Sequence, residues 1–161
     1  MIKTRVLPAI AAVTVVLLPG AAEAQDLTVA AMQACRASLQ PDPDHWGNFI
    51  GETPTLVCGG HDYSNGTEAN RVLEFKSKQT GVQLKLSQQM FSYNVAAYTE
   101  QPLTEYKIDR TNGTMTVMRR TPGGRRTSMT AAQLPPAVRA ALPQGLLMMR
   151  QLRQSERWIP R

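Results

Sequence analysis

The sequence predicts an α+β domain: a small antiparallel sheet of hairpins, about four to five strands, with an N-terminal helix, C-terminal helices and one disulfide. Three observations lead to this prediction. Apolar residues recur with helical spacing at the two ends of the mature chain. Apolar and polar residues alternate in the segments between them, as in half-buried strands. The chain contains only two cysteines. Strands grouped between helices are typical of α+β domains.

The N-terminus is typical of a secretory signal peptide. A basic start precedes an uncharged apolar run at residues 6–18, and Ala22–Ala24 provides a small-residue cleavage site. The run is shorter than the roughly 20 residues that a membrane-spanning helix needs. We therefore predict a cleaved signal at 1–24 and a single mature domain at 25–161, without a transmembrane span. This domain is expected in the periplasm of a bacterium or secreted; an uncleaved anchor or a buried helix is the alternative.

Cys35 and Cys58 are predicted to form a disulfide. An exported chain matures in an oxidising compartment, and an even number of cysteines there favours pairing. In the chain-entropy model, closing this loop stabilises the fold by about 3 kcal/mol. A metal pair or a redox couple is the alternative, but the spacing is far from Cys-x-x-Cys. We interpret the bridge as structural.

Helices are expected at both ends of the mature chain. Asp26–Leu39 carries apolar residues at helical spacing, with Asp26 as the expected N-cap. Two C-terminal helices are expected, at Ala137–Leu142 after a pair of prolines and at Leu146–Arg157. The Leu/Met stripe of the last helix predicts packing on the protein's own sheet, and contact with a membrane surface is the alternative.

The strands are expected in hairpins. The strongest pattern is Thr104–Arg110 and Thr114–Arg120 around Asn112-Gly113, a favoured two-residue turn, which places Ile108 opposite Val117. Two further segments, Arg71–Lys78 and Val82–Ser87, alternate in the same way and suggest another hairpin. Further strands are expected at Phe91–Tyr98 and, near the second cysteine, at Thr55–Cys58.

Charge is divided unevenly along the mature chain. Residues 25–109 have a net charge of −4, whereas residues 110–161 contain ten arginines and one acidic residue, a net charge of +9. Such asymmetry is typical of contact with an acidic partner. The leading hypothesis is therefore an exported, non-catalytic binding or accessory protein. Its arginine-rich half would contact an anionic envelope polymer, lipid headgroups or an acidic protein.

Four arginines bracket a glycine-rich turn and are the candidate anion-binding residues: Arg119, Arg120, Arg125 and Arg126. The planar guanidinium fork donates two hydrogen bonds at once to a phosphate or carboxylate. The alternative is a solvated turn whose charges discourage strand-to-strand aggregation. Nucleic acid is not expected as a partner, because the arginine-rich half offers only Trp158 for stacking and export removes the chain from intracellular nucleic acid.

Two histidines provide the rival hypothesis of a small metal-assisted hydrolase. His45 and His61, with Asp44, would meet the minimum ligand set of a catalytic zinc site if folding brought them together. The alternative is that the aspartates make local turn bonds and the histidines are solvated. In the same region, Trp46 and Phe49 are expected to anchor the loop to the core rather than to form a binding loop.

A third class, a structural envelope component, would act as a stable oligomer without a ligand. No cofactor and no catalytic residue is predicted from the sequence.

Overall fold

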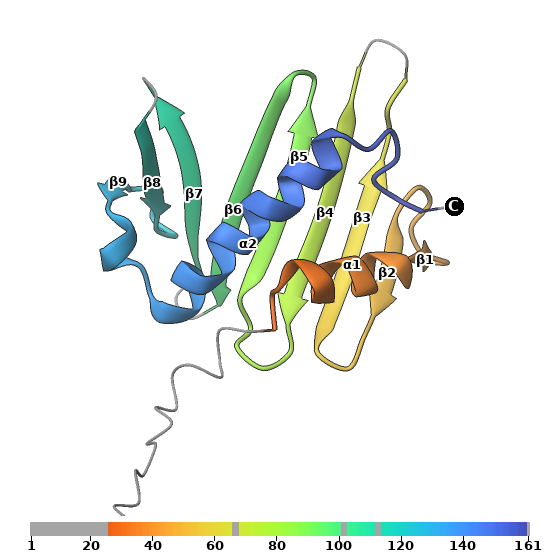
Figure 1. Ribbon diagram of the computed structural model, residues 1–161, viewed down its shortest axis with the longest axis horizontal. Coiled ribbons are helices and arrows are strands. Elements are labelled where there is room, and N and C mark those ends of the chain that lie inside the picture. The colour runs from red at the N-terminus through yellow and green to blue at the C-terminus, as the bar shows by residue number, and fades with distance from the viewer. Residues whose placement is uncertain (1–25, 66–67, 101–102, 112–113, 161) are drawn as a thin grey trace, which may run out of the picture.

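All strands belong to one antiparallel sheet. The computed structural model describes residues 26–65, 68–100, 103–111 and 114–160, so the predicted signal peptide and the Asn112-Gly113 turn lie outside the described residues. Nine strands form the sheet, and each strand pairs with the next along the chain (Figure 1). They are β1 (Gln40–Pro41), β2 (Phe49–Glu52), β3 (Leu56–Asp62), β4 (Asn70–Ser77), β5 (Gln83–Gln89), β6 (Ser92–Glu100), β7 (Leu103–Thr111), β8 (Thr114–Arg120) and β9 (Arg126–Met129).

The expectation of about four to five strands is wrong. The strands that the sequence did not predict are β1 and β9, at the two edges of the sheet, and β2, next to β1; they are only two to four residues long. Residues of β1 and most of β9 are exposed, so these strands lack the alternation of apolar and polar residues that identifies a half-buried strand. Backbone pairing with one neighbour holds them in place.

The N-terminal helix, α1 (Val29–Ala37), begins later than expected. Thr28 is its N-cap, and the Thr28 hydroxyl accepts the N–H of Ala31 at 3.1 Å. Asp26 therefore does not cap the helix; its carboxylate accepts a hydrogen bond from the Ser77 hydroxyl at the end of β4. The predicted disulfide is confirmed: Cys35 of α1 is bonded to Cys58 of β3, with the two Cα atoms 6.1 Å apart.

The two expected C-terminal helices are one continuous helix, α2 (Pro136–Arg153), preceded by the short 3-10 helix η2 (Ala131–Gln133). Pro143 lies inside α2 on the exposed side. An internal proline costs about 3 kcal/mol. The helix nevertheless buries a long stripe, and each large apolar side chain contributes about 1.5–3 kcal/mol. The stripe comprises Val138, Ala141, Leu142, Gly145, Met148, Met149 and Leu152.

Both helices cover the same face of the sheet, as Figure 1 shows. α1 packs against β2 and β3, and α2 packs against β5 and β6. Gly145 allows the close approach of α2, because a Cβ there would lie 2.9 Å from a methyl carbon of Val95. The stripe of α2 thus packs on the protein's own sheet. Within the described ranges, no helix combines the length and hydropathy needed to cross a membrane.

The chain after α2 closes one end of the core. Trp158 is fully buried, and its indole N–H donates to the carbonyl of Leu152 at 3.1 Å. Arg36 of α1 donates to the carbonyls of Arg157 and Trp158. A Cβ on Gly60 would lie 3.1 Å from Ile159, which places the tail over β3. The opposite face of the sheet, called the open face below, carries no helix formed by the described residues.

Removing the disulfide should weaken the fold without changing it. Replacing both Cys35 and Cys58 with Ala opens a loop with a sequence separation of 23 residues, so the free energy of unfolding should fall by about 3 kcal/mol. Urea denaturation of the variant and the parent measures the difference. An equal midpoint for both proteins would contradict a stabilising bridge.

Replacing the two tryptophans should have very unequal effects on stability. Trp158→Ala removes a fully buried side chain and should cost about 3–5 kcal/mol. Trp46 is 94% exposed, which corrects the expectation that it anchors its loop, so Trp46→Ala should change stability by less than about 0.5 kcal/mol. Thermal unfolding of both variants tests this contrast, which a similar loss in each would contradict.

Candidate functional site

In the β8–β9 hairpin, the four clustered arginines flank a three-residue loop, Pro122–Gly124. The carbonyl of Thr121 accepts the N–H of Gly124 at 2.9 Å, and the N–H of Thr121 donates to the carbonyl of Arg125 at 3.1 Å. Gly124 has φ +79°, in the left-handed region that favours glycine. A turn followed by a left-handed glycine is a common three-residue hairpin loop. The loop sets which arginines share a face.

Two of the four arginines lie together on the open face. Arg120 is the Cα partner of Arg126, whereas Arg119 is the partner of Thr127. Because successive side chains of a strand point to opposite faces, Arg120 and Arg126 share the open face and Arg119 lies on the helix-bearing face. Arg125 precedes β9, next to the loop. All four are exposed. The structure therefore brings together Arg120 and Arg126 but separates them from Arg119.

Arg120 and Arg126 border a hollow of about 350 Å³ on the open face. Its other described lining residues are Asn94, Glu105, Lys107, Ile108 and Met118. Lys107 of β7 is the Cα partner of Met118, which precedes Arg120 by two residues and so shares its face of β8. Lys107 was not among the candidate residues predicted from the sequence. The register of the β7–β8 hairpin, which the Asn112-Gly113 turn predicts, would have indicated that Lys107 lies near Arg120.

The three cations of this hollow repel one another. Like charges at directly opposed positions of neighbouring strands are destabilising. Among the described residues, none of Lys107, Arg120 and Arg126 forms an ion pair with a carboxylate. Glu105 is the one acidic residue among the described lining residues. Glu105 is also the Cα partner of Arg120, so it offsets part of this charge. The hollow, called the cationic hollow below, therefore has three cations against one carboxylate among its described lining residues.

Tyr98 lies beside the cationic hollow, and its pKa depends on the charges of two lining residues, Glu105 and Arg120. Burial raises the pKa of Tyr98 to about 12, together with the charge and hydrogen bond of Glu105 and the more distant charge of Glu74. Arg120 acts in the opposite direction and lowers this pKa. The tyrosine is therefore neutral at physiological pH.

The histidine and aspartate candidates lie in the loop before β2 and at the end of β3. His45 Nδ1 lies 2.9 Å from Asp42 Oδ2, and the N–H of Asp44 donates to the other oxygen of Asp42 at 2.9 Å. The Asp44 N–H and then His45 hold the pKa of Asp42 below its ordinary value. The aspartate that pairs with His45 is thus Asp42 rather than the predicted Asp44.

His61 lies in β3, with its ring centroid 4.7 Å from that of Tyr63. His61 and Asp42 both border a small hollow of about 240 Å³. Over the described ranges, no three residues among histidine, cysteine, aspartate and glutamate are grouped so that they could hold a metal ion.

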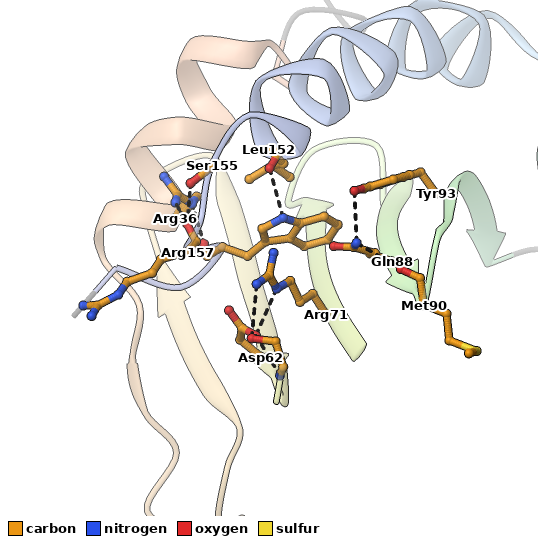
Figure 2. Close-up of polar contacts among 11 residues, drawn as sticks. Arg36, Asp62, Arg71, Gln88, Met90, Tyr93, Leu152, Ser155 and Arg157 are labelled. Carbon is orange, nitrogen blue, oxygen red and sulfur yellow. Dashed lines mark hydrogen bonds and ion pairs between the residues drawn. The ribbon is translucent and has the colours of Figure 1, made fainter. Parts of the chain in front are cut away.

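A polar network closes the ends of β3 and β4 (Figure 2). Asp62 Oδ1 accepts from the Ser64 hydroxyl at 2.8 Å and from Arg71 Nε at 3.1 Å. Burial alone would raise the pKa of Asp62, but the bonds from Ser64 and the charge of Arg71 hold it below its ordinary value. The neighbouring His61 points to the opposite face of β3, so it is not placed to act as a base for Ser64. The network links two strands.

No family model, curated protein or solved structure matches this chain.

The raised pKa of Tyr98 should be visible in a spectrophotometric titration. Glu105→Gln removes a charge that disfavours the phenolate, so the pKa of Tyr98 should fall from about 12 but stay above 10 because burial is the largest cause. The unfolded chain ionises this tyrosine near pH 10. The stability contributed by Tyr98 is thus complete below pH 10 and is lost as pH rises towards 12. An unchanged titration in the variant would contradict this account.

Proposed function

We propose that the protein is an exported, non-catalytic binding protein that holds an anionic partner in the cationic hollow. The observation that carries the proposal is the direct opposition of Arg120 and Arg126 on the open face, with Lys107 beside them. A cluster of like charges reduces the stability of the free protein. A bound carboxylate or phosphate would offset that repulsion. Anion binding would therefore explain why the protein keeps three cations close together.

The residue types suit an anionic group that is held without reaction. The two guanidinium groups each offer a planar fork that matches two oxygens of a carboxylate or phosphate. The ammonium of Lys107 adds a compact positive charge at the same hollow. No helix in the part of the chain that the structure describes covers the open face, so a ligand larger than the hollow could extend across the sheet.

The disulfide supports an extracellular or periplasmic location, because such bridges persist in oxidising compartments. The predicted signal at residues 1–24 adds to this support. In that location the anionic partner would be an envelope polymer, a lipid headgroup or an acidic protein, as the charge asymmetry of the sequence also predicts.

Charge reversal on the open face should weaken binding of anionic probes. The protein is expressed as the full chain, purified after export, and titrated at low ionic strength with poly-L-glutamate, with polyphosphate and with phosphatidylglycerol vesicles. At least one probe should bind. The double variant Arg120→Glu/Arg126→Glu should then raise Kd at least about ten-fold, because attractions become repulsions. Physiological salt should weaken the same interaction, since the Debye length falls to about 8 Å.

The matched control is Arg119→Glu/Arg125→Glu. It makes the same change in net charge on the same hairpin, but Arg119 lies on the other face of β8 and Arg125 precedes β9. This control should keep most of the affinity. An equal loss in both double variants would show attraction to net charge alone and overturn the site. Failure of all three probes would overturn the function, and a stable oligomer without ligand would then favour a structural envelope component.

A further inference from the structure

β6 and β7 are paired over only part of their lengths. Their ladder runs from Glu100–Leu103 to Ala96–Lys107 and ends there. Beyond this point, the residues Ser92–Val95 of β6 have no partner in β7, and Figure 1 shows the two strands diverging towards the end of the sheet. We call this opening the fork, defined by Ser92–Val95 and Ile108–Thr111.

The fork is hollow on both faces of the sheet. On the open face it borders the cationic hollow. On the helix-bearing face it borders a second hollow of about 370 Å³, between the strands and α2, which is lined in part by Val95, Leu146 and Met149. Asn94 and Ile108 line both hollows. A ligand in the fork would therefore reach both faces at once.

The β6 edge of the fork presents backbone groups without a strand partner. Gln89 and Ser92 flank a two-residue turn and pair across it, so they exchange the hydrogen bonds that close the hairpin. Because bonding direction alternates along a strand, the N–H and C=O groups of Tyr93 and Val95 point away from β5 and towards the fork. Val95 is buried, and unpaired backbone groups in such a position are costly.

The outer edges of the sheet are protected, in contrast to the fork. β1 is two residues long and contains Pro41, and β9 is four residues long and begins with Arg126. Short strands, prolines and charges at an edge prevent another chain from pairing there. The β6 edge of the fork has neither proline nor charge at residues 92–95. It is the edge suited to accept a strand.

One wall of the fork is held in place before any ligand arrives. Gln88 Nε2 donates to the hydroxyl of Tyr93 at 3.0 Å and to the carbonyl of Met90 at 3.1 Å, as Figure 2 shows. On the helix side, the guanidinium of Arg153 lies 4.6 Å from the centre of the Tyr93 ring. Because this wall is already ordered, less conformational entropy is lost when a ligand binds.

The positive charge beside the fork favours an acidic strand as the ligand. Three cations line the cationic hollow, whereas Glu105 is the one acidic side chain among its described lining residues. A neutral or basic strand would leave this charge unneutralised. An acidic strand with apolar residues at alternate positions complements the cations on one side and Val95, Leu146 and Met149 on the other.

We propose that the fork binds an extended acidic segment of a partner protein, which adds to β6 by pairing its backbone with Tyr93 and Val95. This inference rests on the proposed function, because the glutamates or aspartates of the segment would occupy the cationic hollow. Main-chain pairing provides affinity in strand addition, and alternate side chains provide specificity.

Two peptides of identical composition test the strand. In the first, four glutamates alternate with four valines; in the second, four glutamates precede four valines. The alternating peptide should bind at least about ten-fold more tightly, since only its glutamates all face the cations. Arg120→Glu/Arg126→Glu should abolish this preference, and the Arg119→Glu/Arg125→Glu control should keep it.

Residue-resolved amide hydrogen exchange tests the pairing itself. On binding the alternating peptide, exchange of the Tyr93 and Val95 amides should slow at least about ten-fold, while Ser92 and Asn94, already paired with β5, should change little. Equal affinity for the two peptides, or unchanged exchange at Tyr93 and Val95, would overturn the strand. If polyphosphate binds through Arg120 and Arg126 but neither peptide does, the fork proposal fails and the anion-binding function stands.

Discussion

Burial on only one face of the sheet is the constraint on which the rest of the structure depends. An antiparallel sheet can leave one face in water, provided that the other is covered. Here α1, α2 and the chain around Trp158 supply that cover, and α2 approaches closely enough that Gly145 contacts the sheet. The apolar core and the cationic hollow therefore lie on opposite faces, so charges on the open face can serve a ligand without entering the core.

Sequence patterns predicted the parts of the fold that bury apolar side chains. Alternation located most of β4 to β8, the pairing of Ile108 with Val117 is confirmed, and the disulfide was predicted from two cysteines in a chain expected to be exported. The same reasoning failed where backbone pairing alone holds a strand, as in β1 and β9. It also predicted two helices, Ala137–Leu142 and Leu146–Arg157, where α2 runs continuously through Pro143, because the buried stripe that holds the helix together depends on its packing against the sheet.

The candidate site was predictable in composition but not in geometry. The sequence identified an arginine cluster around a glycine turn, yet the loop length decides that Arg120 faces Arg126 while Arg119 points away. Lys107 joins them only through the pairing of β7 with β8. The fork has no counterpart in the sequence, because Tyr93 and Val95 alternate with polar residues as in any half-buried strand, and the end of a ladder depends on how whole strands twist and pack.

The Cys35–Cys58 bridge would hold the two parts of the chain together after proteolysis in the loop before β2. That loop, Asp42–Asn48, displays a nearly fully exposed indole and lies inside the covalent ring that the bridge closes. Exposed loops are where proteases cut. A single cut in this loop would break the polypeptide but release nothing, because α1 would stay tethered to β3 through sulfur. In denaturing electrophoresis, the cleaved protein would separate into two fragments only after reduction of the disulfide. All strands would remain part of one covalently linked molecule.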